Sequence, residues 1–150
     1  IALGIAAPAL AQDLVSVSVG YYDIMDDEGA VDARIEYRPD TNVLIENLQP
    51  WAGVEATSDA SIWVGGGLLY DWNFTDNYYF TPSFGAGFYA QGSSDLDLGH
   101  PIEFRSQLEV AYEFENSNRA GIAFSHLSNA SLDDDNPGTE VLSAYWHFPM

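Results

Sequence analysis

The sequence predicts an all-β protein, an eight-stranded antiparallel transmembrane β-barrel. Apolar residues make up 47% of the chain, yet no run approaches the ~18 uninterrupted apolar residues of a membrane-spanning helix. From Asp13 onward the pattern instead alternates apolar and polar residues, with Gly, Asn, Asp and Pro interrupting it about every ten to fifteen residues. The alternating segments number eight, which is even and the smallest usual size of a closed membrane barrel.

Residues 102–115 form the clearest predicted strand. One face is apolar except at Ser106, and the other face is acidic, basic or amide-bearing except at Ala111. The apolar face consists of Ile102, Phe104, Leu108, Val110, Tyr112 and Phe114. A strand in a soluble sandwich is usually about five or six residues long. This alternation is more than twice that length, which is typical of a tilted strand that crosses a bilayer and protrudes from it.

The other seven strands are weaker repeats of the same pattern. They are predicted at 14–22, 30–38, 48–56, 61–72, 77–90, 119–129 and 139–148. The first alternates valine with serine, the second alternates apolar residues with acids and arginines, and the third is the least regular. The fourth and fifth oppose large apolar residues to Gly and Ser. Because open sheet edges do not persist in hydrocarbon, the eight strands must close into a barrel.

Closure assigns the polar faces to the interior and the aromatic residues to the membrane interfaces. The predicted interior network consists of Arg34, Glu36, Arg38, Glu103, Arg105, Glu109 and Glu113. The predicted aromatic girdle consists of Tyr21, Tyr22, Trp72, Tyr78, Tyr79, Tyr145 and Trp146. An eight-stranded interior holds side chains and leaves no open pore, so transport through the lumen is not expected.

Charge and cysteine content exclude several functions. The chain has 23 acidic residues against four arginines and no lysine, a net charge of −19, so nucleic acid would be repelled. Without cysteine, neither a disulfide framework nor a cysteine-based zinc site can form.

The first eleven residues, IALGIAAPALA, are predicted to be a residual signal-peptide segment. The run is apolar and closes with Ala9-Leu10-Ala11, the small-x-small pattern that signal peptidase cuts. Residues 12–150 are then a single outer-membrane barrel domain, exported and multi-pass. The alternative is an ordinary apolar N-terminus.

Strand order fixes which loops share an end of the barrel. With both termini in the periplasm, the turns at 39–46, 73–76 and 116–118 face the periplasm. The loops at 23–29, 57–60, 91–100 and 130–138 then face outward.

Three polar residues interrupt the apolar outer face near the outward rim. His126 and Ser128 continue the apolar stripe of their strand, and Glu140 begins that of the next. In an antiparallel hairpin, Glu140 lies across from 126 or 128, or one diagonal away. A serine, a histidine and a carboxylate supply the nucleophile, base and orienting acid of acyl transfer. Polar residues at a rim also simply contact lipid headgroups, so spacing alone leaves both interpretations open.

The segment HLSNASLDDDNPGTE resembles the signature of the lipid A 3-O-deacylases (PagL family) of Gram-negative outer membranes. The shared elements are His126-x-Ser128-Asn129-Ala130, Leu132 and Asn136-x-Gly138-x-Glu140, and LGHPIEFRSQLEVAYEF upstream resembles the family's sixth strand. The resemblance implies Ser128 as nucleophile, His126 as base and Glu140 as the acid that orients it. It implies Asn136 and the backbone amides near Gly138 as the oxyanion hole. Asn129 alternates inward and is expected to support the loop.

The implied protein is an outer-membrane serine esterase, a carboxylic ester hydrolase that removes the 3-O-linked acyl chain of lipid A in lipopolysaccharide. The substrate's acyl chains are expected along Phe124, Ile122 and Leu142 of the lipid-facing wall. The chemistry requires no metal and no cofactor. Two other functions stay open: a non-catalytic outer-membrane barrel for adhesion or membrane integrity, and a soluble lipocalin-type barrel with its apolar faces inward. The sequence also leaves open the acyl length, latency, and whether the barrel is a monomer or a homodimer.

Two further features are assigned from residue type. Asp133, Asp134 and Asp135 form either a solvated loop tip or a calcium- or magnesium-assisted contact with lipid phosphates. His100 and His147 stand alone and are assigned structural roles.

Overall fold

A computed structural model of the chain describes residues 12–27 and 29–150. The predicted signal-peptide segment, residues 1–11, lies outside the described residues. The described residues form nine strands: β1 (Leu14–Tyr22), β2 (Ala30–Arg38), β3 (Leu48–Thr57), β4 (Ile62–Tyr70), β5 (Trp72–Thr75), β6 (Tyr78–Ala90), β7 (Ile102–Glu113), β8 (Arg119–Ser128) and β9 (Thr139–Pro149). Within these ranges there is no helix long and apolar enough to span a membrane.

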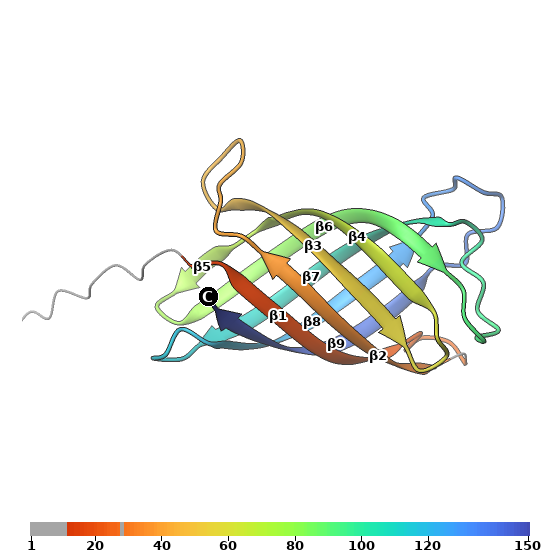
Figure 1. Ribbon diagram of the computed structural model, residues 1–150, viewed down its shortest axis with the longest axis horizontal. Helices are drawn as coiled ribbons and strands as arrows, with labels where there is room; N and C mark the ends of the chain where they lie inside the picture. The colour runs from red at the N-terminus through yellow and green to blue at the C-terminus, as the bar shows by residue number, and fades with distance from the viewer. Residues whose placement is uncertain (1–11, 28) are drawn as a thin grey trace, which may run out of the picture.

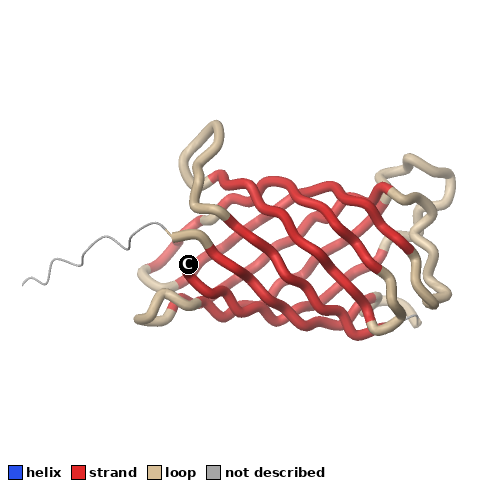
Figure 2. Tube along the Cα trace, in the orientation of Figure 1, coloured by secondary structure: helices blue, strands red, loops and turns tan. Residues whose placement is uncertain are grey.

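The strands form one closed antiparallel barrel (Figures 1 and 2). The sheet order is β4-β3-β2-β1-β9-β8-β7-β6-β5, and a further β4–β6 pairing closes it. Because β4 and β5 both pair with β6, they are two parts of one barrel strand interrupted at Asp71. The predicted eight-stranded antiparallel barrel is confirmed.

The strand 61–72 extends further than its sequence indicates. Residues 73–76 were expected to form a turn, but Trp72–Thr75 continue along β6 as β5. A register shift between Asn73 and Thr75 accommodates the extra residue. Asn73 and Asp76 suggest a turn, whereas Trp72, Phe74 and Thr75 favour a strand, and the bulge lets strand pairing persist to Thr75.

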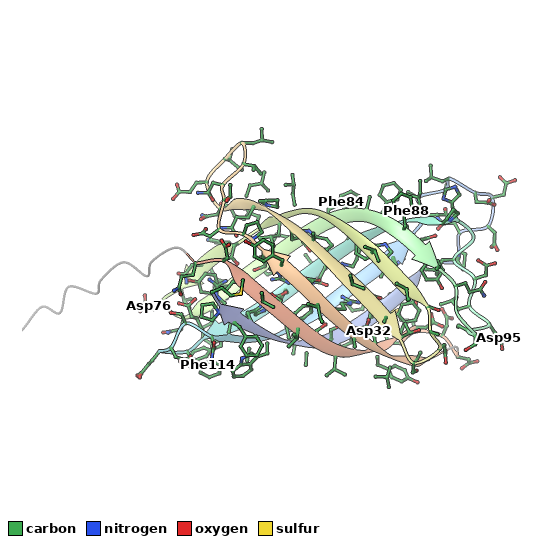
Figure 3. The ribbon with its side chains drawn as sticks, in the orientation of Figure 1. Asp32, Asp76, Phe84, Phe88, Asp95 and Phe114 are labelled. Atoms are coloured by element: carbon green, nitrogen blue, oxygen red, sulfur yellow. The ribbon has the colours of Figure 1, made fainter. Side chains whose placement is uncertain are left out.

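The barrel is polar inside and apolar outside. Along β2, Ile35 is 63% exposed, whereas its neighbour Glu36 is 1% exposed. Phe84 and Phe88 project from the outer wall in the same way (Figure 3). A lipocalin-type barrel would have its apolar faces inside, so this pattern excludes it. Apolar side chains exposed all around the wall require an apolar solvent, as in a transmembrane barrel of the outer-membrane type.

Charged side chains fill the interior as the alternation predicts. Glu36 Oε1 lies 2.5 Å from Arg105 Nη2, and Glu36 Oε2 lies 2.8 Å from Arg38 Nη2. Arg38 also contacts Glu109 at 2.9 Å. Two predicted members differ. Glu103 is fully buried but forms no ion pair with an arginine of the described chain. Glu113 is only partly buried, and it pairs with Arg119 at 2.8 Å near the end of β7. Pairing with arginine offsets the cost of burying the other carboxylates.

The predicted aromatic girdle is wrong for three residues. Tyr79 is half-buried on the inward-facing side of β6, with the Arg119 guanidinium 3.4 Å from its ring centroid, whereas Tyr78 faces outward. Tyr22 and Tyr145 are both 3% exposed and face the interior, where the Tyr145 hydroxyl lies 2.9 Å from Glu36. Each has an aromatic neighbour in sequence, Tyr21 or Trp146, that faces outward. Since successive residues of a strand point to opposite faces, only one of each pair can belong to the girdle.

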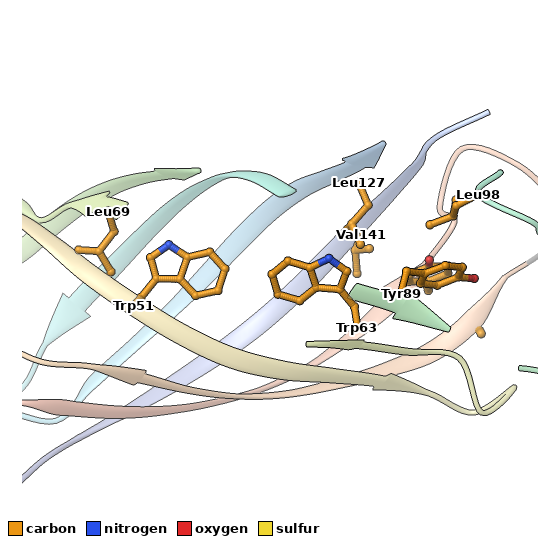
Figure 4. Close-up of a cluster of buried hydrophobic side chains, with 9 residues drawn as sticks. Trp51, Trp63, Leu69, Tyr89, Leu98, Leu127 and Val141 are labelled. Atoms are coloured by element: carbon orange, nitrogen blue, oxygen red, sulfur yellow. The ribbon is translucent and has the colours of Figure 1, made fainter. Parts of the chain in front are cut away.

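An apolar cluster occupies part of the lumen (Figure 4). Its buried members are Tyr22, Ala30, Trp51, Trp63, Leu69, Tyr89, Leu98, Leu127 and Val141. Leu98 comes from the loop between β6 and β7 and is fully buried. This part of the lumen is therefore packed with side chains.

The first and last strands place both ends of the described chain at one end of the barrel, which we call the terminal end (Figure 1). The β6–β7 and β8–β9 loops lie at the opposite end, which we call the loop end (Figure 1). This arrangement matches the predicted grouping of loops.

Candidate active site

β8 and β9 carry the three candidate catalytic residues on the outer wall at the loop end. β8 places His126 and Ser128 on one face, and the register pairs His126 directly with Glu140 of β9. Of the arrangements that the sequence allowed, the structure has the direct pair.

His126 and Glu140 form the best-defined contact of the site. His126 Nδ1 lies 2.8 Å from Glu140 Oε1, and the two side chains are 41% and 22% exposed. A carboxylate at Nδ1 favours the tautomer with its proton on that nitrogen. The lone pair of Nε2 is then available to accept a proton.

Ser128 is near this pair but is not bonded to it. Its side chain is half-buried, two residues beyond His126 on the same face, and Phe104 of β7 is its partner across the strand pair. Among the described residues, no hydrogen bond joins Ser128 to His126. Catalytic hydrogen bonds are often looser in unliganded sites. The structure thus brings the histidine and the acid together and leaves the serine hydroxyl unengaged.

Gly138 lies against the imidazole of His126. Its φ is +66°, a left-handed conformation that favours glycine. A Cβ added there would lie 2.8 Å from His126 Cε1 and 3.3 Å from Nε2. Glycine at 138 therefore leaves room for the imidazole, a contact that the sequence pattern alone does not indicate.

Asn129 and Asn136 organise the β8–β9 loop. The backbone N–H of Asn129 donates to Asn136 Oδ1 at 2.9 Å. Because Oδ1 is occupied in this way, the amide NH₂ of Asn136 is the group left to donate elsewhere. The Asn129 side chain is fully buried and faces inward, and it donates to the carbonyl oxygens of Leu98 and Asp135.

A groove of about 360 Å³ begins beside His126 on the outer wall. Its lining consists of Pro82, Ser83, Ser106, Gln107, Leu108, Phe124 and His126. Ser106 is directly across from His126, and Leu108 is across from Phe124, two residues nearer the terminal end. The groove thus leads from His126 toward the middle of the barrel wall. A serine between large apolar residues leaves the space for it.

The groove includes one of the three expected acyl contacts. Phe124 lines it, whereas Ile122 and Leu142 lie on the wall outside its lining. The acyl chains were expected along β8 and β9, whereas the small residues of the groove, Ser83 and Ser106, belong to β6 and β7. The interruption of the apolar face at Ser106 was the sequence signal for this groove.

The acidic tip of the β8–β9 loop is exposed. Asp133 Oδ1 accepts a hydrogen bond from the backbone N–H of Asp135 at 3.2 Å. No group of three His, Asp or Glu side chains that could hold a metal ion occurs in the described ranges.

The other two histidines contact residues outside the candidate site. His147 is buried between Ser16 and Glu109, and His100 Nδ1 accepts a hydrogen bond from the backbone N–H of Ile102.

Comparisons of fold identify barrels of the same kind. The crystal structure of the outer membrane enzyme PagL has a TM-score of 0.68 and 19% identity, covering 91% of this chain and 99% of that one. Neisserial surface protein A also has a TM-score of 0.68, with 12% identity and coverage of 92% and 97%. Because two differently named proteins match equally well, these likenesses show the fold alone.

Comparisons of sequence are more specific. The lipid A deacylase PagL of Bordetella bronchiseptica is 24% identical over 94 residues, which are 61% of this chain. The match spans about half, 53%, of that relative's length. The sequence model of the family described as lipid A 3-O-deacylase (PagL) matches residues 33–149, well over half of the chain and all of the segment that carries the site. The chain therefore belongs to the lipid A 3-O-deacylase (PagL) family.

Proposed function

We propose that the protein is an outer-membrane esterase that hydrolyses the 3-O-linked acyl chain of lipid A through Ser128, His126 and Glu140. The observation that carries the proposal is the 2.8 Å contact between His126 Nδ1 and Glu140 Oε1 on the lipid-facing wall. A histidine oriented by a carboxylate, beside an unengaged serine hydroxyl, is the arrangement that acyl transfer requires. Family membership supports lipid A as the substrate.

The reaction proceeds in two steps. Ser128 Oγ attacks the ester carbonyl while His126 Nε2 takes its proton, and the tetrahedral intermediate then expels the 3-oxygen of lipid A. That oxygen takes the proton from His126, which leaves an acyl-enzyme. Water, deprotonated by His126, attacks the acyl-enzyme and releases the fatty acid and Ser128. Glu140 keeps the imidazole in the reactive tautomer and stabilises its protonated form.

The oxyanion is stabilised by the β8–β9 loop. In this proposal the NH₂ of Asn136 and the backbone amide of Gly138 donate to the carbonyl oxygen as its charge develops. The hydrogen bond from Asn129 N–H to Asn136 Oδ1 supports this assignment, because it holds the Asn136 amide in one orientation. The close approach of Gly138 to His126 keeps the Gly138 backbone near the base.

The location suits a substrate that already lies in the outer leaflet. The acyl chain to be removed enters the groove beside His126, and the sugar and phosphates stay at the loop end in the headgroup region. Residues 1–11, as the remainder of an export signal, would account for delivery to this membrane.

The experiment that tests the proposal is deacylation of defined lipid A by the purified barrel in detergent, followed by mass spectrometry. We expect the loss of one hydroxyacyl group and release of the corresponding free fatty acid when the 3-position carries an ester-linked chain. Lipid A that already lacks this chain should be unchanged. If substrate of the first kind also stays intact, the protein is a non-catalytic barrel.

The groove gives a prediction about chain length. Replacing Ser106 with Phe should fill the space between His126 and Phe124. Each methylene that loses its buried contact costs about 0.8 kcal/mol. Two displaced methylenes should then raise KM roughly tenfold for a long acyl chain and much less for a short one. Measuring both parameters on esters of different chain length checks this.

The matched control is Ile122→Phe, which adds a ring on the same wall outside the groove lining. Its kinetics should resemble those of the wild type for every chain length. An equal effect of both substitutions would mean that the groove does not hold the acyl chain.

A further inference from the structure

Asn129 connects the candidate active site to a loop from a different hairpin. Its Nδ2 donates to Asp135 O at 2.7 Å, within the β8–β9 loop, and to Leu98 O at 3.0 Å, within the β6–β7 loop. Its backbone N–H donates to Asn136 Oδ1. One buried amide therefore joins two loops that are far apart in sequence.

The β6–β7 loop is anchored in the barrel by Leu98. This side chain is fully buried and belongs to the apolar cluster of the lumen together with Tyr89, Leu127 and Val141. Figure 4 shows Leu98 at one end of the cluster and Leu69 at the other. Burial of the side chain fixes the position of the Leu98 carbonyl, the group that Asn129 binds.

Gly99 brings the two loop backbones together. Its φ is +85°, and a Cβ at this position would collide with the carbonyl oxygen of Asp135. The same virtual Cβ would also lie 3.2 Å from Asn129 Nδ2. The β6–β7 loop thus lies against the β8–β9 loop directly, and no larger residue fits between them.

We propose that the β6–β7 loop is a positioning element for the reaction, with Leu98 and Gly99 holding the β8–β9 loop in its active conformation. The inference rests on the proposed function, because the held loop carries the oxyanion donors Asn136 and Gly138. Leu98 acts through Asn129 and touches no reacting atom. His126 and Glu140 stand on paired strands and do not depend on this contact.

The oxyanion donors depend on the loop contact and the base does not, so a weaker contact should change the kinetic constants in a specific way. Loosening the loop misplaces the oxyanion donors, which act in the transition state, so kcat should fall while KM changes little. The pH dependence of kcat should stay as in the wild type, since the base and its orienting acid are held by β8 and β9. A role limited to barrel stability would change neither kcat of the folded protein nor its pH profile.

The test compares Leu98→Ala with Leu69→Ala, which removes the same side chain from the other end of the same cluster. Leu98→Ala and Gly99→Ala should each lower kcat about tenfold or more, with KM and the pH profile retained. Leu98→Met should restore most of the activity, because it refills the anchor position. Leu69→Ala should leave kcat of the folded barrel near the wild-type value. All variants are compared only as folded barrels that migrate differently in gels before and after boiling.

A second measurement is independent of activity. Hydrogen exchange of backbone amides in residues 130–138 should be faster in Leu98→Ala than in the wild type, and unchanged in Leu69→Ala. If the wild type does not deacylate lipid A, the proposed function fails, and hydrogen exchange still reports whether the two loops are coupled. Equal exchange in both variants, or an unchanged kcat in folded Leu98→Ala, would overturn the inference.

Discussion

Ser128→Ala should abolish nearly all deacylation by the folded barrel, with kcat lowered on the order of 10⁴-fold or more. The reason is that, in the proposed mechanism, this hydroxyl forms the bond of the acyl-enzyme. His126→Ala should have a similar effect, and the double variant should lose little more, because members of a triad fail as a unit. Single-turnover kinetics on defined lipid A measures all three.

The control for this series is Ser117→Ala, which removes a serine hydroxyl from the β7–β8 turn at the opposite end of the barrel. Its activity should equal that of the wild type. Folding is checked by the heat-dependent gel shift. Retained turnover in a folded Ser128→Ala protein would exclude Ser128 as the nucleophile.

The barrel could be predicted because its alternation is long and its interior is charged. In β7 the acidic and amide residues alternate with apolar ones over a length that soluble sheets seldom reach. This pattern determined both the membrane setting and the direction that each side chain faces. It also limited Glu140 to a few positions relative to His126, which the observed register reduces to one.

Other features depend on contacts that the pattern does not contain. Tyr145 looked like an interfacial residue by type, yet its position between Ala144 and Trp146 turns it inward. The groove could not be assigned to a strand pair because its shape depends on which small residues become neighbours after closure. The contact of Gly138 with His126 requires the loop conformation, which sequence spacing leaves undetermined.

The carboxylates near the site should separate into two kinds by their response to charge removal. Glu140→Gln should lower kcat by about 10³- to 10⁴-fold. The amide keeps the shape of the side chain but has no charge to stabilise the protonated imidazole. It can also present its NH₂ to Nδ1, which favours the wrong tautomer. The effect should persist at high salt, because His126 Nδ1 and Glu140 Oε1 are only 2.8 Å apart.

Asp133, Asp134 and Asp135 should behave differently, since they are exposed at the loop tip. They can influence catalysis only through the approach of an anionic glycolipid, and salt screens such an effect over about 8 Å at physiological ionic strength. Replacing all three with Asn should change activity mainly at low salt and low divalent concentration. Added calcium or magnesium should help the wild type more than the triple variant.

Measuring both variants across a matrix of salt and calcium concentrations distinguishes orientation of the base from recognition of the substrate. Glu140→Gln should be defective in every condition, and the triple Asn variant only where its charges are unscreened. The opposite outcome, loss of turnover in the triple variant at every salt level with Glu140→Gln fully active, would mean that the acid that orients His126 comes from the loop. The 2.8 Å contact would then be a structural pair at the membrane rim and not part of the catalytic apparatus.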